Sequence, residues 1–542
     1  MAEKKFAVTF EEKQIDAIFS KVAQCRLPGA AVGIAIGGRP VYRKGFGLAS
    51  MDSSTMLSPT TRMRIGSTTK HFTCLAYLLL CEAGKADLDD PIGKFLPELH
   101  PVNQTVTMRQ LMGNIGGLRD VVDMVLQFSG DGPLLTDADL LSCYEKISDT
   151  NFLPGVDWAY NNGGFLLLTA VIERGFGQPL ETVLRERIFE PVGMFDTALR
   201  RHDRELCYNS AATHALDSAG NYRRASFRTP LSGDGGIVST VDDMLRWLVH
   251  MDGPYVGNAY TWYHIKTPLK VAIGSSTGYG LGLMRDSYRG VERIHHAGSV
   301  AGGNSQMLKV PSAGLDIVIM LNRRDMLAVQ LAEDIIDACL PGLEPRRSEI
   351  VVPLVTGVFR SPKTGRVIKF MRARSSTARE PGVGQQLALV DGAEIALEAD
   401  QSGMLCSVGL TGFIKLRMKV IGDVACPRVI RCIHFGNPDV LVPIAKSDDG
   451  RSLVDIEGNY LSQSTGILAN VSLGTHGGQL MTSGLLGGSA RYDLEPLASG
   501  IWRATSGSEI PWGGVLSVDE DGRGFRFSAA LRTWALPFRR MP

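Results

Sequence analysis

The sequence lacks the features that would assign it to several large classes of protein. No apolar run is long enough to span a bilayer, and the opening "MAEKKFAVTFEEKQ" is charged where a secretory leader would be apolar. The net charge is only +1 over 542 residues, so the charge balance does not attract nucleic acid or an anionic membrane. We therefore expect a cytoplasmic protein without a membrane or nucleic-acid partner, periplasmic only if a leader has been removed.

Paired cysteines and metal-ligand spacings are also missing. The nine cysteines are dispersed, with no CxxC pair and no histidine at a zinc spacing. An odd number of scattered cysteines favours free, buried thiols in a reducing compartment over a disulfide framework. We predict no metal and no cofactor.

The chain is too long for one hydrophobic core, since cores stop growing at roughly 250–300 residues. Helical spacing over residues 10–26 is followed by two strand-like runs around the turn at 37–40. The segment "STTKHFTCLAYLLLCEAG" exceeds strand length and ends in glycine, which predicts a buried helix. Ser67 lies at or just before the first turn of that helix.

Residues 87–251 are mostly helical in pattern, and strands return after them. We expect helices at 106–112, 137–147, 164–174 and 180–189, strands at 280–284, 305–310 and 315–321, and a last helix at 326–340. Strands therefore stand at both ends of this part of the chain, with helices between them. This order predicts one sheet in which the early and late strands lie side by side, with an all-helical insertion between them in the sequence.

The character of the sequence changes after "PGLEPRRSEIVVP", which resembles a linker. Short apolar alternations separated by Gly, Asp and Asn turns then predict two small antiparallel barrels. We expect three domains: a catalytic domain at 1–345 and barrels at 346–447 and 448–542.

The pair Ser67 and Lys70 forms the only SxxK in the chain. At a helix start this spacing brings both side chains to one face, so the amine can reach the hydroxyl. A serine hydroxyl needs a base, and a lysine serves when burial or nearby positive charge lowers its pKa. The alternative is a plain helix cap beside a solvated lysine.

Tyr160 and Asn162, in "WAYNNGGF", form the only YxN. A tyrosine beside a lysine can relay its proton, and an asparagine amide can bind both the lysine and a substrate carbonyl. A turn asparagine next to a half-buried tyrosine is the alternative for this motif taken alone.

SxxK followed by YxN resembles the penicillin-recognising serine hydrolases, which include serine β-lactamases, DD-peptidases and their esterase and peptidase relatives. The resemblance implies an α/β (α+β) transpeptidase-like domain, an antiparallel sheet flanked by helices, with a third motif on a strand. The text KTG stands at 363–365, but after the linker, so we interpret it as a decoy. The better candidate is HxG, formed by His296 and Gly298 in "RIHHAGSVAGG".

In that interpretation Gly298 lets a substrate backbone approach the strand, and the amides of Ser299 and Ser67 form an oxyanion hole. His296 contacts substrate or relays protons, whereas His295 points to the opposite face and belongs to the core. A purely structural role for His296 is one rival interpretation. A metal bound by either histidine is another, although further ligands at suitable spacing are missing.

The HxG motif, the length and the two lipocalin-like barrels resemble the D-aminopeptidase branch, in which a loop of the last barrel enters the active site. The matching loop is 482–491, "TSGLLGGSAR", which has no carboxylate for a substrate ammonium. Peptidases that open linear peptides beside a D-residue, such as those acting on linearised microcystin, fit as well.

We therefore expect a cofactor-free serine amidohydrolase acting on small peptides or amides through an acyl-enzyme, and a homodimer is compatible with this function. Ser67, Lys70 and Tyr160 carry catalysis, and Asn162, His296, Gly298 and Ser299 bind substrate. The deacylating base stays open among Lys70, Tyr160 and His296. Alternatives are an esterase, a β-lactamase or DD-peptidase, and a sensor that binds peptide or β-lactam without turnover.

Overall fold

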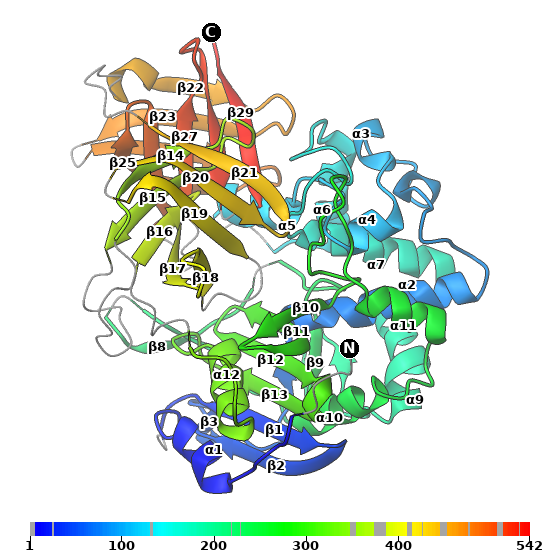
Figure 1. The fold of residues 1–542 in the computed structure, drawn as a ribbon. Helices are drawn as coiled ribbons and strands as arrows, with labels where there is room; N and C mark the ends of the chain where they lie inside the picture. The colour runs from blue at the N-terminus through cyan, green and yellow to red at the C-terminus, as the bar shows by residue number, and fades with distance from the viewer. Residues whose placement is uncertain are drawn as a thin grey trace.

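The fold is that of a computed structural model. It describes residues 6–23, 26–130, 134–217, 219–227, 229–346, 354–372, 386–408, 415–424, 426–444, 453–474, 477–506, 513–529 and 532–542. Figure 1 shows a mixed domain of helices and one large sheet, with two barrels stacked against its helical part.

The large sheet joins the two ends of the first 340 residues, as predicted. Its strands are antiparallel and ordered β10-β11-β12-β13-β1-β2, with Ala30 of β1 opposite Leu321 of β13. The N-terminal hairpin therefore completes a sheet made mainly of late strands. The strands are β1 (Ala30–Ile36), β2 (Arg39–Phe46), β10 (Met284–Tyr288), β11 (Val291–Val300), β12 (Gly303–Val310) and β13 (Leu315–Leu321).

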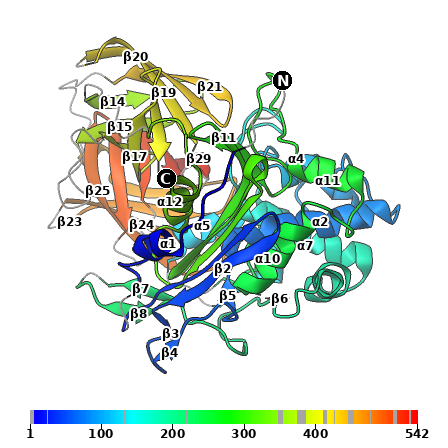
Figure 2. The same cartoon turned by 60° about the horizontal axis from the view of Figure 1, so that its bottom comes forward.

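Helices cover both faces of this sheet (Figure 2). Alternation along β1 places Val32 and Ile34 in a cluster with α1 (Glu12–Ile18) and α12 (Ala328–Cys339). The opposite face packs on α10 (Val241–His250) and α2 (Lys70–Glu82). A β-carbon on Gly33 would lie 2.4 Å from Val241 Cγ1, so the glycine allows α10 to lie close to β1.

The region at 87–251 is less purely helical than predicted. Short strands near its end, β6 and β9, form a small sheet with β5, the strand just before Ser67, and β7 and β8 form a separate hairpin. The helices are α3 (Pro101–Gln104), α4 (Met108–Met112), α5 (Val121–Phe128), α6 (Asp137–Lys146), α7 (Asn162–Phe176), α8 (Leu180–Leu184) and α9 (Glu190–Val192), and α11 (Ala259–Lys266) follows. The short strands are β3 (Leu48–Ser50), β4 (Thr55–Met56), β5 (Met63–Arg64), β6 (Ala198–Leu199), β7 (His214–Leu216), β8 (Tyr222–Arg224) and β9 (Ile237–Ser239).

Two further expectations need correction. The predicted helix at 10–26 is shortened to α1, and the predicted strand at 280–284 is a turn that leads into β10. Gly282 in that turn has φ +76°, and a β-carbon there would lie 2.6 Å from His71 Cα. The glycine therefore bends the chain against the start of α2 instead of extending it.

Two closed antiparallel barrels of eight strands each follow, as predicted. The predicted limits of the three domains remain a proposal, because residues 347–353 and 445–452 lie outside the described residues. The first barrel has β14 (Gly357–Arg360), β15 (Val367–Arg372), β16 (Gln386–Val390), β17 (Ala393–Ala399), β18 (Leu405–Val408), β19 (Leu416–Asp423), β20 (Cys426–His434) and β21 (Asn437–Pro443). The second has β22 (Gly458–Leu461), β23 (Leu468–Gly474), β24 (Gly477–Ser483), β25 (Ser489–Ala498), β26 (Ile501–Ser506), β27 (Gly514–Val518), β28 (Gly524–Ala529) and β29 (Thr533–Arg540).

Within the described ranges, none of the helices combines the length and the apolar character needed to cross a membrane. In the same part of the chain, no three His, Cys, Asp or Glu side chains gather as a metal-binding group. Six cysteines of the described ranges are free thiols: Cys74, Cys81, Cys143, Cys207, Cys339 and Cys432.

Candidate active site

Ser67 lies in a tight turn, η1 (Gly66–Thr69), that leads directly into α2. The turn is fastened to the sheet, because Thr68 Oγ1 donates to the carbonyl of His296 at 3.2 Å and Ser305 Oγ donates to the carbonyl of Ile65 at 2.8 Å. Only 7% of Ser67 is exposed. The nucleophile candidate is therefore held rigidly at the junction of a helix and two central strands.

Lys70 is completely buried one turn further on. Its Nζ lies 2.8 Å from Asn162 Oδ1, 2.6 Å from the carbonyl of Asp234 and 3.3 Å from Ser67 Oγ. Burial lowers the pKa of this amine to about 7, although the Asp234 carboxylate opposes that shift. A large fraction of Lys70 is thus neutral at pH 7 and able to accept a proton.

The loop that carries Asp234 is fixed from two helices. Thr73 of α2 donates to the carbonyl of Gly233 at 2.8 Å, and the amide of Gly233 donates to Thr169 Oγ1 of α7 at 3.1 Å. A β-carbon on Gly233 would lie 2.6 Å from both threonines. The glycine therefore lets the loop lie close enough to present the Asp234 carbonyl to Lys70.

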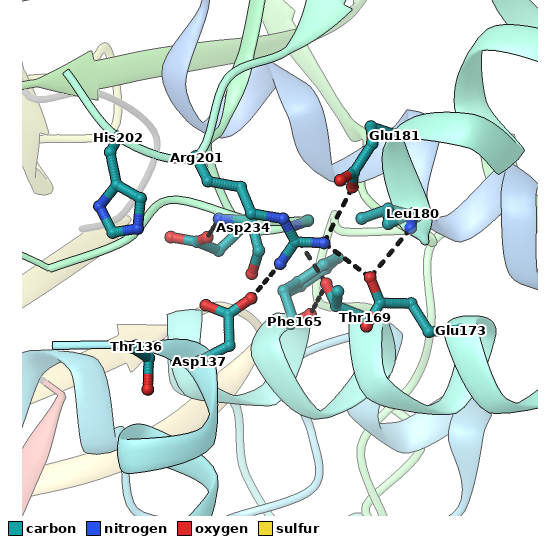
Figure 3. A network of polar contacts seen from close by, with 12 residues as sticks. Thr136, Asp137, Phe165, Thr169, Glu173, Leu180, Glu181, Arg201, His202 and Asp234 are labelled. Atoms are coloured by element: carbon teal, nitrogen blue, oxygen red, sulfur yellow. Dashed lines mark hydrogen bonds and ion pairs between the residues drawn. The ribbon is translucent and has the colours of Figure 1, made fainter. Parts of the chain in front are cut away.

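Arg201 supports the same loop from the outside (Figure 3). Its guanidinium donates to Asp137, to Glu173 at 2.6 Å and to Glu181 at 3.0 Å, joining α6, α7 and α8. Its backbone carbonyl accepts from the amide of Leu231 at 2.9 Å. One arginine thus links three helices to the start of the loop bearing Asp234.

Tyr160 and Asn162 approach Lys70 from the start of α7. The Asp120 carboxylate accepts from the amides of Asn162 and Gly163, both at 2.9 Å, and so fixes the first turn of that helix. Lys70 Nζ lies 4.7 Å from the centre of the Tyr160 ring. Burial raises the pKa of the Tyr160 phenol, and a hydrogen bond with Ser67 opposes the shift. Tyr160 is therefore a protonated phenol beside the serine.

The HxG segment lies on β11, directly beside the Ser67 turn. Gly66 has φ +52°, and a β-carbon there would lie 2.8 Å from the amide nitrogen of Ser299. This places the Ser299 amide next to the nucleophile, where an oxyanion donor is needed. Whether the amides of Ser67 and Ser299 bind an oxyanion remains a proposal.

His296 is fully buried and held at both ring nitrogens. Nδ1 donates to the carbonyl of Ala297 at 2.6 Å, which leaves Nε2 to accept from the Tyr279 hydroxyl at 3.1 Å. Burial, and then the charge of Lys70, lower the pKa of this ring well below its usual value. His296 is thus a neutral residue of the site wall, and its predicted contact with substrate stays a prediction.

The remaining predictions separate into core and surface positions. His295 is buried, with Nε2 3.3 Å from Asp286 Oδ1. The KTG text lies between β14 and β15, where Ser361 Oγ accepts from the amide of Thr364 at 2.9 Å. The KTG tripeptide therefore belongs to a turn of the first barrel, as expected if it is not the third catalytic motif.

The loop at 482–491 lies on the C-terminal end of α5. Thr482 Oγ1 donates to the carbonyl of Phe128 at 3.0 Å, and Ser489 forms a bridge with Gly130. These contacts do not test its predicted entry into the active site, which stays a prediction.

Two barrel residues that the sequence did not predict contact the wall of the candidate site. Phe435, in the turn between β20 and β21, stacks on Trp158 with ring centres 3.5 Å apart. Arg532, in the turn between β28 and β29, stands 5.1 Å from the centre of the Tyr160 ring. No motif surrounds either residue, so only the folded barrels reveal these contacts.

The β-lactamase family model matches residues 15–339. The chain belongs to the β-lactamase family. It is 27% identical to a D-aminopeptidase of Brucella canis over 483 residues, 88% of this chain and 87% of that relative. This member of the family is a serine hydrolase of the peptidase-like group.

Solved structures of the family have the same fold. The octameric penicillin-binding protein homologue from Pyrococcus abyssi matches with a TM-score of 0.56 and 23% identity, over 79% of this chain and 99% of that one. SurE matches with a TM-score of 0.52 and 20% identity, over 80% of this chain and 99% of that one. At these identities the likeness concerns the fold.

Proposed function

We propose that this β-lactamase-family chain hydrolyses the peptide or amide bond beside a D-amino acid in small peptides, through an acyl-enzyme on Ser67. The D-aminopeptidase relative, aligned over 88% of the chain, supports the substrate class. D-Aminopeptidase action and cleavage of linear peptides such as opened microcystin both fall within this class.

The geometry around Lys70 carries the proposal. A neutral amine has two N–H groups and one lone pair. The carbonyl of Asp234 at 2.6 Å and Asn162 Oδ1 at 2.8 Å take the two N–H groups. The lone pair is then left for Ser67 Oγ, 3.3 Å away. Lys70 is thereby arranged as the base that activates the serine.

Acylation follows from this arrangement. Ser67 Oγ attacks the substrate carbonyl carbon as its proton passes to Lys70, and the carbonyl π electrons move onto the oxygen. The amides of Ser67 and Ser299 donate to that oxyanion. The C–N bond then breaks as the phenol of Tyr160 gives its proton to the leaving nitrogen, and Lys70 passes the proton taken from Ser67 on to Tyr160, so that both groups regain their starting states.

Deacylation reverses the proton path with water in place of the amine. His296 has its ring nitrogens engaged by Ala297 and Tyr279, so it is poorly arranged to accept a proton from water. Lys70 and Tyr160 both lie beside Ser67, and we assign the activation of water to these two residues together. Water adds to the ester carbonyl as its proton passes to these groups, and the bond from the acyl carbon to Ser67 Oγ then breaks as they return that proton to Oγ, which releases the acid and restores the Ser67 hydroxyl.

Mass spectrometry of the intact protein tests the proposal. Rapidly quenched mixtures with matched D- and L-alanyl anilides, a linear peptide with an internal D-residue, a β-lactam and an activated ester report which substrates form an adduct. We expect an adduct on Ser67 with the D-configured amides and steady turnover of them. The Ser67→Ala variant should form no adduct while keeping its melting temperature.

The other outcomes separate the alternatives. Turnover of the ester alone would establish an esterase in place of the proposed function. One equivalent of adduct without turnover on any substrate would establish a sensor. An L-specific adduct would overturn the proposed stereochemistry.

A further inference from the structure

The second barrel supplies a cation to the wall of the catalytic site. Arg532 lies between β28 and β29, its side chain only 10% exposed, with its guanidinium 5.1 Å from the centre of the Tyr160 ring. Lys70 Nζ lies 4.7 Å from the same ring centre. The Tyr160 ring therefore lies beside the Lys70 amine of the catalytic domain and beside the guanidinium cation of Arg532 from the barrel.

The turn that carries Arg532 is locked onto the catalytic domain. Asn151 Nδ2 donates to the carbonyl of Arg532 at 2.6 Å, and Asn151 Oδ1 accepts from the amide of Trp534 at 3.1 Å. Arg119 donates to the carbonyl of Trp534 at 2.7 Å. Three hydrogen bonds thus fix the backbone from the carbonyl of Arg532 to Trp534 against the catalytic domain, so the position of the arginine is set by the fold.

A buried carboxylate lies on the far side of Arg532. Asp123 of α5 is 1% exposed, with Oδ1 3.6 Å from Arg532 Nη1 and Oδ2 3.4 Å from Thr533 Oγ1. Burial raises the pKa of Asp123 to about 7, and Arg532 opposes that shift. Burial therefore favours the neutral form of Asp123, whereas its pairing with Arg532 favours the carboxylate.

We propose that Arg532 is a positioning residue of the acylation site, which holds the Tyr160 ring beside Ser67 and places positive charge near Lys70. The proposal rests on the proposed function, since it assigns Arg532 a part in the same acylation step. It makes the second barrel a component of the active site.

The charged and titratable groups around Lys70 give the direction of the effect. Asp234 from its loop and Asp120 from before α5 raise the pKa of the amine, as does Cys74 on α2, whereas Arg532 lowers it. Tyr160, two residues before α7, and His296 on β11 complete the surroundings, and burial favours the neutral form of both. Removal of Arg532 should therefore leave Lys70 more protonated at a given pH.

The experiment compares Arg532→Gln and Arg532→Lys in the full chain. With an activated ester that does not ionise between pH 5 and 9, we expect the acid limb of kcat/KM to move to higher pH in Arg532→Gln. A shift of one unit would lower the rate at pH 6 about tenfold. Arg532→Lys should restore the limb, and KM should change less than kcat.

A matched control lies on the same hairpin. Arg526 on β28 pairs with Asp519 at 3.1 Å, its side chain 45% exposed. Arg526→Gln should leave the pH profile unchanged. Because Arg532→Gln leaves Asp123 without its ion partner, Arg532→Gln with Asp123→Asn provides a neutral pair that can fold where the single variant does not. It should show the same shifted limb.

The outcomes are distinguishable from those of the proposed function. An unshifted acid limb in Arg532→Gln and in the double variant Arg532→Gln with Asp123→Asn, with only a lower melting temperature, would overturn the role of Arg532. The acyl-enzyme on Ser67 would be unaffected by that result. Failure of the wild-type chain to acylate Ser67 would instead overturn the proposed function. A limb that moves to lower pH would also contradict the assignment.

Discussion

A β-carbon on Gly298 would lie 1.9 Å from the carbonyl oxygen of Ile65, two residues before the nucleophile candidate Ser67. The same carbonyl accepts a hydrogen bond from Ser305 Oγ at 2.8 Å. Gly298 therefore sets how closely β11 approaches the serine turn. The sequence suggested that this glycine makes room for substrate; the fold itself already requires it.

Gly298→Ala should lower both the melting temperature and the acylation rate. The added methyl must push the Ser67 turn away from β11, and displacement of a reacting group by about 1 Å costs roughly a hundredfold in rate. Thermal unfolding and pre-steady-state acylation measure the two effects. Gly253→Ala is the control, because nothing lies within 4 Å of a β-carbon there; equal behaviour of the two variants would contradict the packing argument.

The pH dependence of kcat/KM should follow the neutral form of Lys70. Burial lowers the pKa of its amine to about 7, so the amine loses its proton, and the rate rises, as pH increases through 7. Well below that value the rate should fall about tenfold for each pH unit. A rate independent of pH between 5 and 8 on a non-ionising ester would exclude Lys70 as the base.

Tyr160→Phe should impair amide hydrolysis more than ester hydrolysis. The phenol stays protonated because burial raises its pKa, and an amine leaving group needs that proton whereas a nitrophenolate does not. Loss of a general acid costs about 10²–10⁴-fold. The ratio of kcat/KM for an anilide and a nitrophenyl ester, compared with that of the wild type, measures the difference; an unchanged ratio would remove the acid role.

Phe435→Ala should weaken the contact between the first barrel and the active site. Its ring stacks on Trp158 at 3.5 Å, and loss of a buried phenylalanine ring costs about 3–5 kcal/mol. Chemical denaturation should show this loss together with a lower kcat, because Trp158 precedes Tyr160 by two residues. Phe195→Ala, at a ring that is 75% exposed, should change neither quantity. Wild-type stability and kcat in Phe435→Ala would show that the stack contributes little.

The fold could be predicted well where periodicity was strong. Strand β13 (Leu315–Leu321) coincides with its predicted limits, and α12 and the two barrels are present. The errors fell where tertiary contacts override a local pattern. "YGLGLM" alternates like a strand, yet Gly282 at φ +76° turns the chain onto His71.

The candidate site could be predicted only as far as its motifs extend. SxxK, YxN and HxG are visible in the sequence, and the fold brings Ser67, Lys70 and Asn162 together. Asp234 contributes a backbone carbonyl, which any residue could supply, so its identity carries no signal. Arg532 and Phe435 lie in barrel turns. Their contacts with the catalytic domain depend on how whole domains pack together, which no local sequence pattern predicts.

The order of strands in the large sheet has a consequence for synthesis on the ribosome. The N-terminal hairpin emerges early, but β1 pairs with β13, and Thr68 bonds a carbonyl 228 positions further along the chain. Until those late strands emerge, β1 has an unpaired edge, and the turn that carries Ser67 has no strands to pack against. The nascent chain must therefore protect an exposed sheet edge until β13 has been synthesised, and the proposed site around Ser67 cannot be complete before then.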